Sequence, residues 1–375
     1  MVMMALDHVR EFFHADAMTG SPTNLATTTP ILFFTRWITH FCAPVFLFLS
    51  GMSAFLNGQK KTKMALSVFL IKRGLWLLAI EIVVISFVLT FNPFYNIIFL
   101  EVIWATGISM IILGLLIHLP FCVIVLIGVL IFFGHNLLDG PETARQGKLG
   151  AIWAILHGRS AFFSINANHS LLLGYSFLPW TGIMIMGYCF GRLYAAGASQ
   201  LKRKKILLST GAALVVLFIV LRFINVYGNP VPWSAQQTRV LDFLSFLNTN
   251  KYPPSLLYSC MTLGPALIVL ALIENTSNRV TVFFNIYGRV PLFYFIVHFF
   301  FIHILCMILF FASGYTFKDA YGGKGQIFVF RPVHFGYPLW EVYIIWALVV
   351  TVLYPLCKKY NHYKSTHQKW WLSYL

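Results

Sequence analysis

Charged residues are scarce in this chain: Asp, Glu, Lys and Arg make up 10% of its 375 residues, against about 25% in a typical soluble protein. Acidic residues are the rarest, with 11 Asp and Glu beside 27 Lys and Arg. So few charges cannot cover a water-exposed exterior, which excludes a soluble globular fold as well as a disordered chain. With 59% hydrophobic residues and 37 phenylalanines, much of the surface must have lipid as its solvent.

Motifs of several enzyme and metal-site classes are missing too. The sequence contains no GxSxG, HExxH or P-loop, so serine hydrolases, zinc proteases and nucleotide hydrolases have no support. The six cysteines lie in apolar segments without CxxC spacing, which argues against a disulfide framework and a thiolate metal site. His298 and His303 are about 140° apart on a helix and cannot share a metal ion. We therefore expect no metal.

Basic residues are abundant, and the net charge is +16. They fall in short clusters between apolar runs, which is typical of topology signals rather than of a nucleic-acid surface. We expect the lipid bilayer as a partner and no nucleic acid. The richest basic loops lie at residues 60–73, 202–205, 279–289 and 358–369. The positive-inside rule places these loops and the C-terminus in the cytoplasm.

Long apolar windows predict nine complete membrane-spanning helices. They cover residues 31–56, 74–91, 98–117, 119–138, 176–196, 206–226, 255–274, 290–312 and 339–357. Residues 1–9 predict only the outer end of a further helix, since nine residues rise about 14 Å against a membrane core of about 30 Å. The expected fold class is all-α, a polytopic membrane helix bundle, and residues 1–375 form a single integral membrane domain.

Close helix packing is indicated at Gly187 and Gly191, which are four residues apart in one span. Such a small-residue face serves either contacts within one chain or contacts between the subunits of a homo-oligomer. The spans show no internal repeat, and many secondary transporters are built from inverted repeats.

The span at residues 31–56 carries the deepest polar side chains. His40 lies roughly 13 Å from its outer end, and Arg36 is one turn above on the same face. The ring of Pro44 displaces the carbonyl of His40, which predicts a kink at the imidazole. Each polar group at this depth costs about 2.5–3.5 kcal/mol. The two interpretations are a functional site and a polar cluster that only holds helices together.

A second polar cluster lies at the outer end of the first helix. If that helix continues to residue 14, then Asp7, Arg10, Glu11 and His14 share one face, and His8 points about 100° away. A carboxylate one turn from an imidazole orients its tautomer and raises its basicity, as general base catalysis requires. The alternative is an ordinary interfacial cluster of ion pairs.

Three further polar residues lie within apolar spans: Glu81, Glu101 and His298. His298 lies at a depth similar to that of His40, so the two rings can meet across the bundle. Together with Arg36 and His40, these side chains support an alternative function, a small-solute or proton-coupled transporter with a polar pathway. The missing repeat and the clustering of imidazoles on one side argue against it.

Over nearly its whole length the chain resembles bacterial members of the heparan-α-glucosaminide N-acetyltransferase catalytic-domain family. The resemblance rests on ALDHVREFF, FFTRWITHFCAPVFLFLSG, LPWTGIMIMGYCFGRL, YPPSLLYSCMTLGPAL, YGRVPLFYFIVHFFFIH and YPLCKKYNHYKSTHQKWWLSYL. It implies an acyltransferase of the bacterial cytoplasmic (inner) membrane. Such an enzyme moves an acetyl or other acyl group from cytosolic acyl-CoA to an amine or hydroxyl on the outer side. The implied acceptor is an envelope glycan or another small molecule.

The resemblance also suggests roles for individual residues. Lysosomal members of the family have an asparagine at the end of the first helix and a histidine in the next outer loop, beside the thioester. Asp7 takes the asparagine-like position here, and His14 is the nearest loop histidine. We expect four catalytic residues: His8 or His14 as the base, Asp7 orienting it, and His40 as a relay or acyl carrier. The expected substrate-binding residues are Arg36, as oxyanion or phosphate partner, Arg10 and His298.

Overall fold

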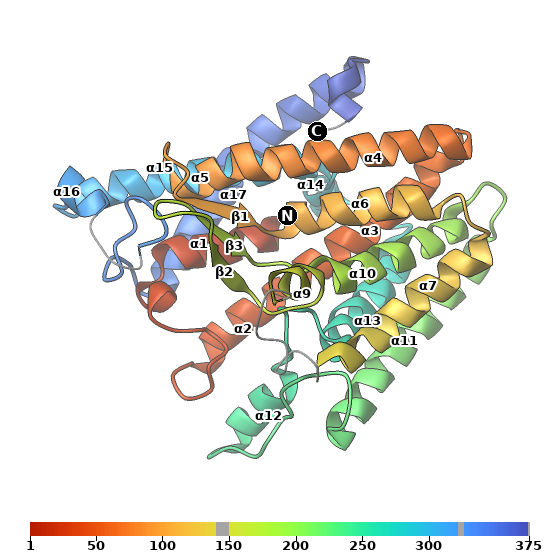
Figure 1. Cartoon of the computed structure of the whole chain (residues 1–375), viewed down its shortest axis with the longest axis horizontal. Helices are drawn as coiled ribbons and strands as arrows, with labels where there is room; N and C mark the ends of the chain where they lie inside the picture. The colour runs from red at the N-terminus through yellow and green to blue at the C-terminus, as the bar shows by residue number, and fades with distance from the viewer. Residues whose placement is uncertain (140–149, 322–325, 374–375) are drawn as a thin grey trace. The chain divides into compact units, whose positions relative to one another are not determined.

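The computed structural model describes residues 1–139, 150–321 and 326–373 (Figure 1). Its regular structure is almost entirely helical, which confirms the all-α prediction. Six helical segments in the described part are long and apolar enough to cross a membrane: Pro30–Gly58, Phe121–Leu138, Gln200–Ile224, Leu256–Ile273, Pro291–Ala312 and Leu339–Thr366. The chain is therefore an integral membrane protein.

The other three predicted spans are helical as well, but they are shorter or more charged. Helices α6 (Val102–Leu116) and α10 (Phe177–Gly191) have 15 residues each, fewer than the about 20 that cross a membrane unaided. Helix α4 (Lys63–Ile80) contains Lys63, Lys72 and Arg73 and continues through a π-helical turn into α5 (Ser86–Thr90). Every predicted span thus coincides with a helix, and six of them also have the length and hydropathy of a full crossing.

The chain folds into two compact units. The first comprises Met1–Cys42, Val83–Ile97 and Thr276–Leu375, and the second Ala43–Ile82 and Ile98–Asn275. The expectation of a single functional domain over residues 1–375 stays a prediction.

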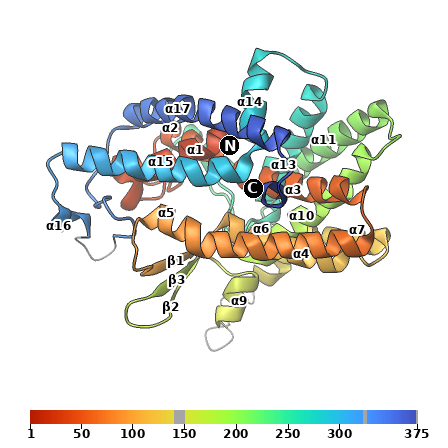
Figure 2. The same ribbon diagram turned by 90° about the horizontal axis from the view of Figure 1, so that it is seen from above.

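Helix α1 (Val2–Phe13) is the centre of the first unit. It packs against α2 (Pro30–Thr39), α15 (Pro291–Ala312) and α17 (Leu339–Thr366), and α15 also lies beside α17 (Figure 2). Ala5, Val9, Phe12 and Phe13 have no exposed surface. The apolar side of α1 is thus fully packed. The other described helices of the unit are α5, α14 (Arg279–Arg289), α16 (Phe317–Ala320) and the short η1 (Ala15–Met18) and η5 (Trp370–Ser373).

The predicted interruption near His40 is present. Helix α2 begins at Pro30, where the side chain of Thr29 caps the backbone N–H of Leu32, and it ends at Thr39. Helix α3 (Cys42–Gly58) begins two residues after His40. The break lies at the position from which Pro44 displaces an i−4 carbonyl.

The second unit is built from pairs of packed helices. Helix α4 lies beside α6, α10 contacts both α6 and α7 (Phe121–Gly134), and α11 (Gln200–Ile224) lies beside α13 (Leu256–Ile273) (Figure 1). A Cβ on Gly51 of α3 would lie 2.0 Å from the backbone oxygen of Met184, and one on Gly187 would lie 2.0 Å from that of Phe48. Gly187 therefore serves a contact within one chain, between α3 and α10.

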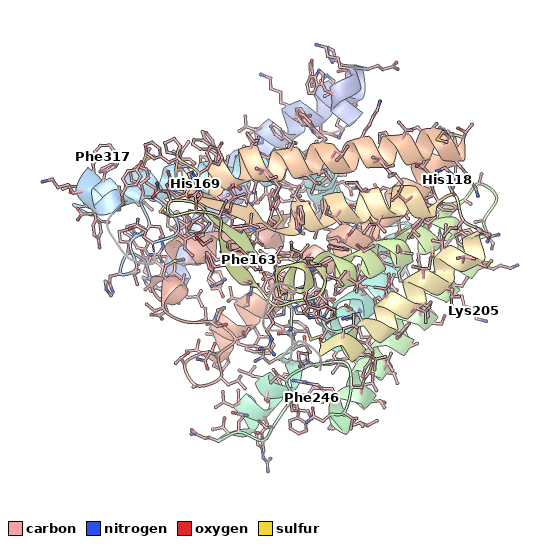
Figure 3. All side chains as sticks on the ribbon, in the orientation of Figure 1. His118, Phe163, His169, Lys205, Phe246 and Phe317 are labelled. Carbon is pink, nitrogen blue, oxygen red and sulfur yellow. The ribbon has the colours of Figure 1, made fainter. Side chains whose placement is uncertain are left out.

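A small sheet and short helices complete the second unit. The strands β1 (Ile97–Leu100), β2 (Ala161–Ser164) and β3 (Ser170–Leu173) pair in the order β1-β3-β2. The hairpin of β2 and β3 is antiparallel with Ala161 opposite Leu173, and it carries Phe163 and His169 (Figure 3). The short helices are η3 (His135–Leu138), α9 (Gly150–Leu156), η4 (Arg192–Tyr194) and α12 (Arg239–Leu247).

Candidate active site

Asp7 is the centre of a buried charge cluster in the first unit. Its carboxylate accepts from Nη2 of Arg10 at 3.1 Å, one turn along α1, and forms an ion pair with Nη1 of Arg36 on α2. Only 6% of Asp7 and 3% of Arg10 are exposed. Burying an unpaired charge costs several kcal/mol, so the three groups stabilise one another only as a set. The cluster joins α1 to α2.

Glu11 connects this cluster to an imidazole. One oxygen of its carboxylate accepts from Nδ1 of His8 at 3.2 Å, and the other lies 3.5 Å from Nη2 of Arg10 and 4.0 Å from Nη1 of Arg36. Because Nδ1 of His8 donates, Nε2 is the basic nitrogen of the neutral ring. The sequence predicts Asp7 as the orienting carboxylate, whereas the carboxylate that contacts His8 is that of Glu11. The i, i+3 spacing of His8 and Glu11 was the signal that could have revealed this contact.

His298 lies against His8. Their ring centroids are 5.3 Å apart, and the ring of Phe299 lies 4.1 Å from that of His8. The His298 ring stacks on Tyr294, and its Nδ1 donates to the Tyr294 carbonyl at 2.9 Å. A carbonyl only accepts, so the proton is on Nδ1 and Nε2 is an acceptor. Among the described residues, no group hydrogen-bonds with that buried Nε2.

His14 lies just beyond the end of α1, not on its face. The helix ends at Phe13 because His14 is extended, with φ −77° and ψ 135°, and pairs with Tyr337 in a parallel bridge. Burial is the largest effect on the pKa of His14 and lowers it; Asp16 raises it, and Arg10 and Arg331 lower it. The net shift is downward, so the imidazole is neutral at pH 7 and can accept a proton.

A cavity of about 310 Å³ opens beside His14 in the first unit. Arg10 and His14 line it from one side, and the loop between α1 and α2 supplies polar side chains on the other, among them Asp16, Asn24 and Thr27. This volume is at the lower end of ligand sites in proteins. Nε of Arg10 is buried, and no acceptor for it exists among the residues that the structure describes. The cavity is therefore lined by His14, whose pKa is lowered, and by Arg10, which has a buried N–H donor without an acceptor.

The other predicted residues lie apart from this cavity or have structural partners. His40 is buried at the break between α2 and α3, and its expected contact with His298 stays a prediction. The ring nitrogens of His303 lie 3.2 and 2.7 Å from the carbonyl oxygens of Val88 and Val329, and a neutral ring donates to one of them.

Glu81 and Glu101 belong to the second unit. One carboxylate oxygen of Glu81 accepts from the backbone N–H of Glu101 at 2.6 Å, at the start of α6. Glu81 thus caps a helix N-terminus, where unpaired N–H groups and the helix dipole favour a carboxylate. This contact gives the buried carboxyl group a structural role.

The described residues contain no group of three or more His, Cys, Asp or Glu side chains that could hold a metal ion.

Comparison with known proteins identifies a family. A family model described as "Heparan-alpha-glucosaminide N-acetyltransferase, catalytic" matches residues 1–222, more than half of the chain. The match includes the charge cluster and the cavity, and it ends before His298 and Arg331. No curated protein and no solved structure matches the chain. Because the match covers most of the chain and the helices are those of a membrane protein, the chain belongs to the heparan-alpha-glucosaminide N-acetyltransferase catalytic family.

Proposed function

We propose that this protein transfers an acetyl or other acyl group from acyl-CoA to an amine or hydroxyl of a glycan or small-molecule acceptor. The single observation that carries the proposal is the position of His14. His14 lines a polar cavity, burial and nearby positive charge lower the pKa of its imidazole, and the ring forms no hydrogen bond within the described part of the chain. A ring in that state is a general base for a nucleophile that enters the cavity.

The proposed reaction has two steps. A nitrogen of His14 takes the proton of the acceptor N–H or O–H, while the acceptor atom forms a bond to the thioester carbonyl carbon. The tetrahedral intermediate then collapses, the C–S bond breaks, and the departing CoA sulfur receives the proton from the imidazolium. The products are the acylated acceptor and free CoA, so no further reactant is needed.

Arg10 is the proposed donor to the oxyanion of the intermediate. Arg10 lines the cavity, and its buried Nε–H has no acceptor among the described residues. Its charge is balanced by Asp7, so the donor is held in place before the reaction begins. One such preorganised donor contributes about 2.7–4 kcal/mol to catalysis. Arg36, also paired with Asp7, holds this arrangement and remains a candidate partner for the CoA phosphates.

His8 has a supporting role in this proposal. Glu11 orients its ring, and His298 and Phe299 enclose it, so the Glu11–His8 pair is a second base or a proton relay. We assign relay or acyl-carrier chemistry to His40 only as a hypothesis. The proposed cellular setting is the bacterial inner membrane with the C-terminus in the cytoplasm, so that cytosolic acyl-CoA is the donor and the acceptor is on the outer side.

The test is acyl transfer by the full chain in lipid nanodiscs. Radiolabelled acetyl-CoA is mixed with glucosamine as an amine probe or methyl β-glucoside as a hydroxyl probe, and label on the sugar is measured. We expect transfer by the wild type and a loss of about 10²–10⁴-fold in His14→Ala. Sugar flux into proteoliposomes without any labelled product would instead favour the transporter, in which no covalent product forms.

A further inference from the structure

Arg331 is a buried cation held by backbone carbonyls. Its Nη2 donates to the carbonyl of His14 at 2.8 Å, and its Nη1 donates to that of Pro332 at 2.6 Å and to that of Phe335. Arg331 is only 1% exposed. Over residues 1–139, 150–321 and 326–373, no carboxylate pairs with it. An unpaired buried charge is costly, so its position beside His14 calls for an explanation.

The segment that begins with Arg331 closes around the backbone of His14. The N–H of Tyr337 donates to the carbonyl of Phe13 at 2.7 Å, and the N–H of Ala15 donates to the carbonyl of Tyr337 at 3.1 Å. Gly336 lies so close that a Cβ there would be 2.6 Å from Cα of Ala15. Together with the bond from Arg331, these contacts fix His14 from both sides. Residues 331–337 thus set where the imidazole stands.

The charges around the His14 ring come from both segments. Arg10 on α1 and Arg331 are positive, and Asp16 in the next turn is negative. Asp16 is exposed to solvent, so its effect is screened, whereas both guanidinium groups are buried. Asp7 and Glu11 already pair with Arg10. Arg331 is therefore the positive charge near His14 that no carboxylate in the described ranges neutralises.

We propose that Arg331 is a positioning residue of the active site, which fixes the backbone of His14 and adds a buried positive charge that, together with burial and Arg10, disfavours the imidazolium. The inference rests on the proposed function in one respect: His14 must be the base. Burial and a like charge both disfavour the imidazolium, and a buried charge acts more strongly than an exposed one because less solvent screens it. A further consequence is that the imidazolium formed during catalysis gives up its proton readily.

The chain offers a matched control in Arg222, at the outer end of α11 in the second unit. Like Arg331 it is 1% exposed, and it donates only to backbone carbonyls: those of Val231, Ser245, Phe246 and Asn248. Phe246 is labelled in Figure 3. None of these acceptors belongs to a histidine. Arg222→Met therefore removes an equally buried, carbonyl-bound guanidinium without touching His14.

The experiment measures the titration of His14 without any substrate. Diethyl pyrocarbonate modifies neutral imidazole, and mass spectrometry of the full chain in nanodiscs gives the rate at His14 as a function of pH. We expect the midpoint to rise by about 0.5–1 pH unit in Arg331→Met and to stay at the wild-type value in Arg331→Lys and Arg222→Met. A merely structural arginine would not move this midpoint.

A second readout covers the case in which Arg331→Met does not fold. Arg331→Lys keeps the charge but cannot reproduce the three-carbonyl contact, so we expect a loss of kcat/KM of about tenfold with an unchanged His14 midpoint. Equal midpoints in Arg331→Met and Arg222→Met, or full activity in Arg331→Lys, would overturn the proposal. Because the titration uses neither donor nor acceptor, it stands even if acyl transfer is not found.

Discussion

The carboxylate of Asp7 on α1 pairs with the guanidinium of Arg36 on α2, across 29 positions of sequence. This ion pair ties together the two helices between which the loop of the active-site cavity runs. Asp7 also holds Arg10, which has the unused N–H donor. The catalytic geometry that we propose therefore depends on one aspartate that need not touch the substrate.

Asp7→Asn should be more damaging to the fold than Arg36→Gln. Loss of Asp7 removes an ion-pair partner from two guanidinium groups at once, whereas loss of Arg36 leaves Asp7 paired with Arg10. Removing one member of a buried ion pair costs about 3–5 kcal/mol, and we expect Asp7→Asn in that range and Arg36→Gln below it. Denaturant unfolding in detergent measures the order. Equal losses would show that Asp7 does not serve both arginines.

His14 should matter more than His8 for transfer. His14→Ala removes the base, with an expected loss in kcat of about 10²–10⁴-fold, and His8→Ala or Glu11→Gln removes a supporting pair, with a loss of about tenfold. Initial rates of CoA release by the three variants decide between the imidazoles. If His8→Ala is the most damaged and His14→Ala stays active, the base is His8 with Glu11 as its orienting carboxylate.

The decrease of transfer activity at low pH should follow the protonation of His14. Its pKa in the folded protein lies below the ordinary value, because burial and two guanidinium groups disfavour the charged form. Activity should therefore be nearly complete at pH 7 and fall only as the pH drops below about 6.5, the unperturbed value. An acid limb centred at or above pH 6.5 would contradict this assignment.

The folding stability should also depend on the protonation of His14, and it should decrease as the pH falls. A histidine whose pKa is lowered by folding contributes stability that is present above about pH 6.5 and is lost as the pH falls through the folded-state pKa. The wild type should thus lose stability relative to His14→Gln as the pH is lowered from about 7 to about 5. Parallel unfolding midpoints for the two proteins over this window would refute the prediction.

A bulky side chain in the cavity should weaken binding of the acceptor more than binding of acetyl-CoA. Thr27 lines the cavity and Ala26 beside it does not, so Thr27→Trp is expected to raise the KM of the acceptor about tenfold or more while acetyl-CoA affinity changes less than about twofold. Ala26→Trp is the matched control and should leave both unchanged. A Thr27→Trp protein with normal acceptor KM would place the acceptor elsewhere.

The helices were predictable because apolar windows of membrane length leave few alternatives, and each predicted span coincides with a helix. The cluster of Asp7, Arg10 and Glu11 was predictable as well, since helical spacing puts these residues on one face. The end of α1 was not: sequence reasoning considered a helix continuing to His14, but pairing with Tyr337 stops it at Phe13. The periodicity of apolar residues is a local signal, so it contains no information on a contact between His14 and Tyr337.

Arg331 could not be predicted for the same reason. It lies 317 residues from His14 in sequence, and nothing in its local sequence distinguishes it from a loop arginine in a headgroup layer. Glu81, by contrast, stood out in the sequence, but its role did not. A carboxylate in an apolar run suggested either a proton or ion path or a pairing with a neighbouring helix, but only tertiary structure could show that it caps α6.

The most direct test of the central claim is acceptor-dependent release of CoA from acetyl-CoA by the full chain in nanodiscs, with wild type and His14→Ala compared at pH 7. The account predicts that adding glucosamine or methyl β-glucoside accelerates CoA release by the wild type, and that His14→Ala retains no more than about 1% of that increment. Equal increments in the two proteins, or none in the wild type, would contradict it.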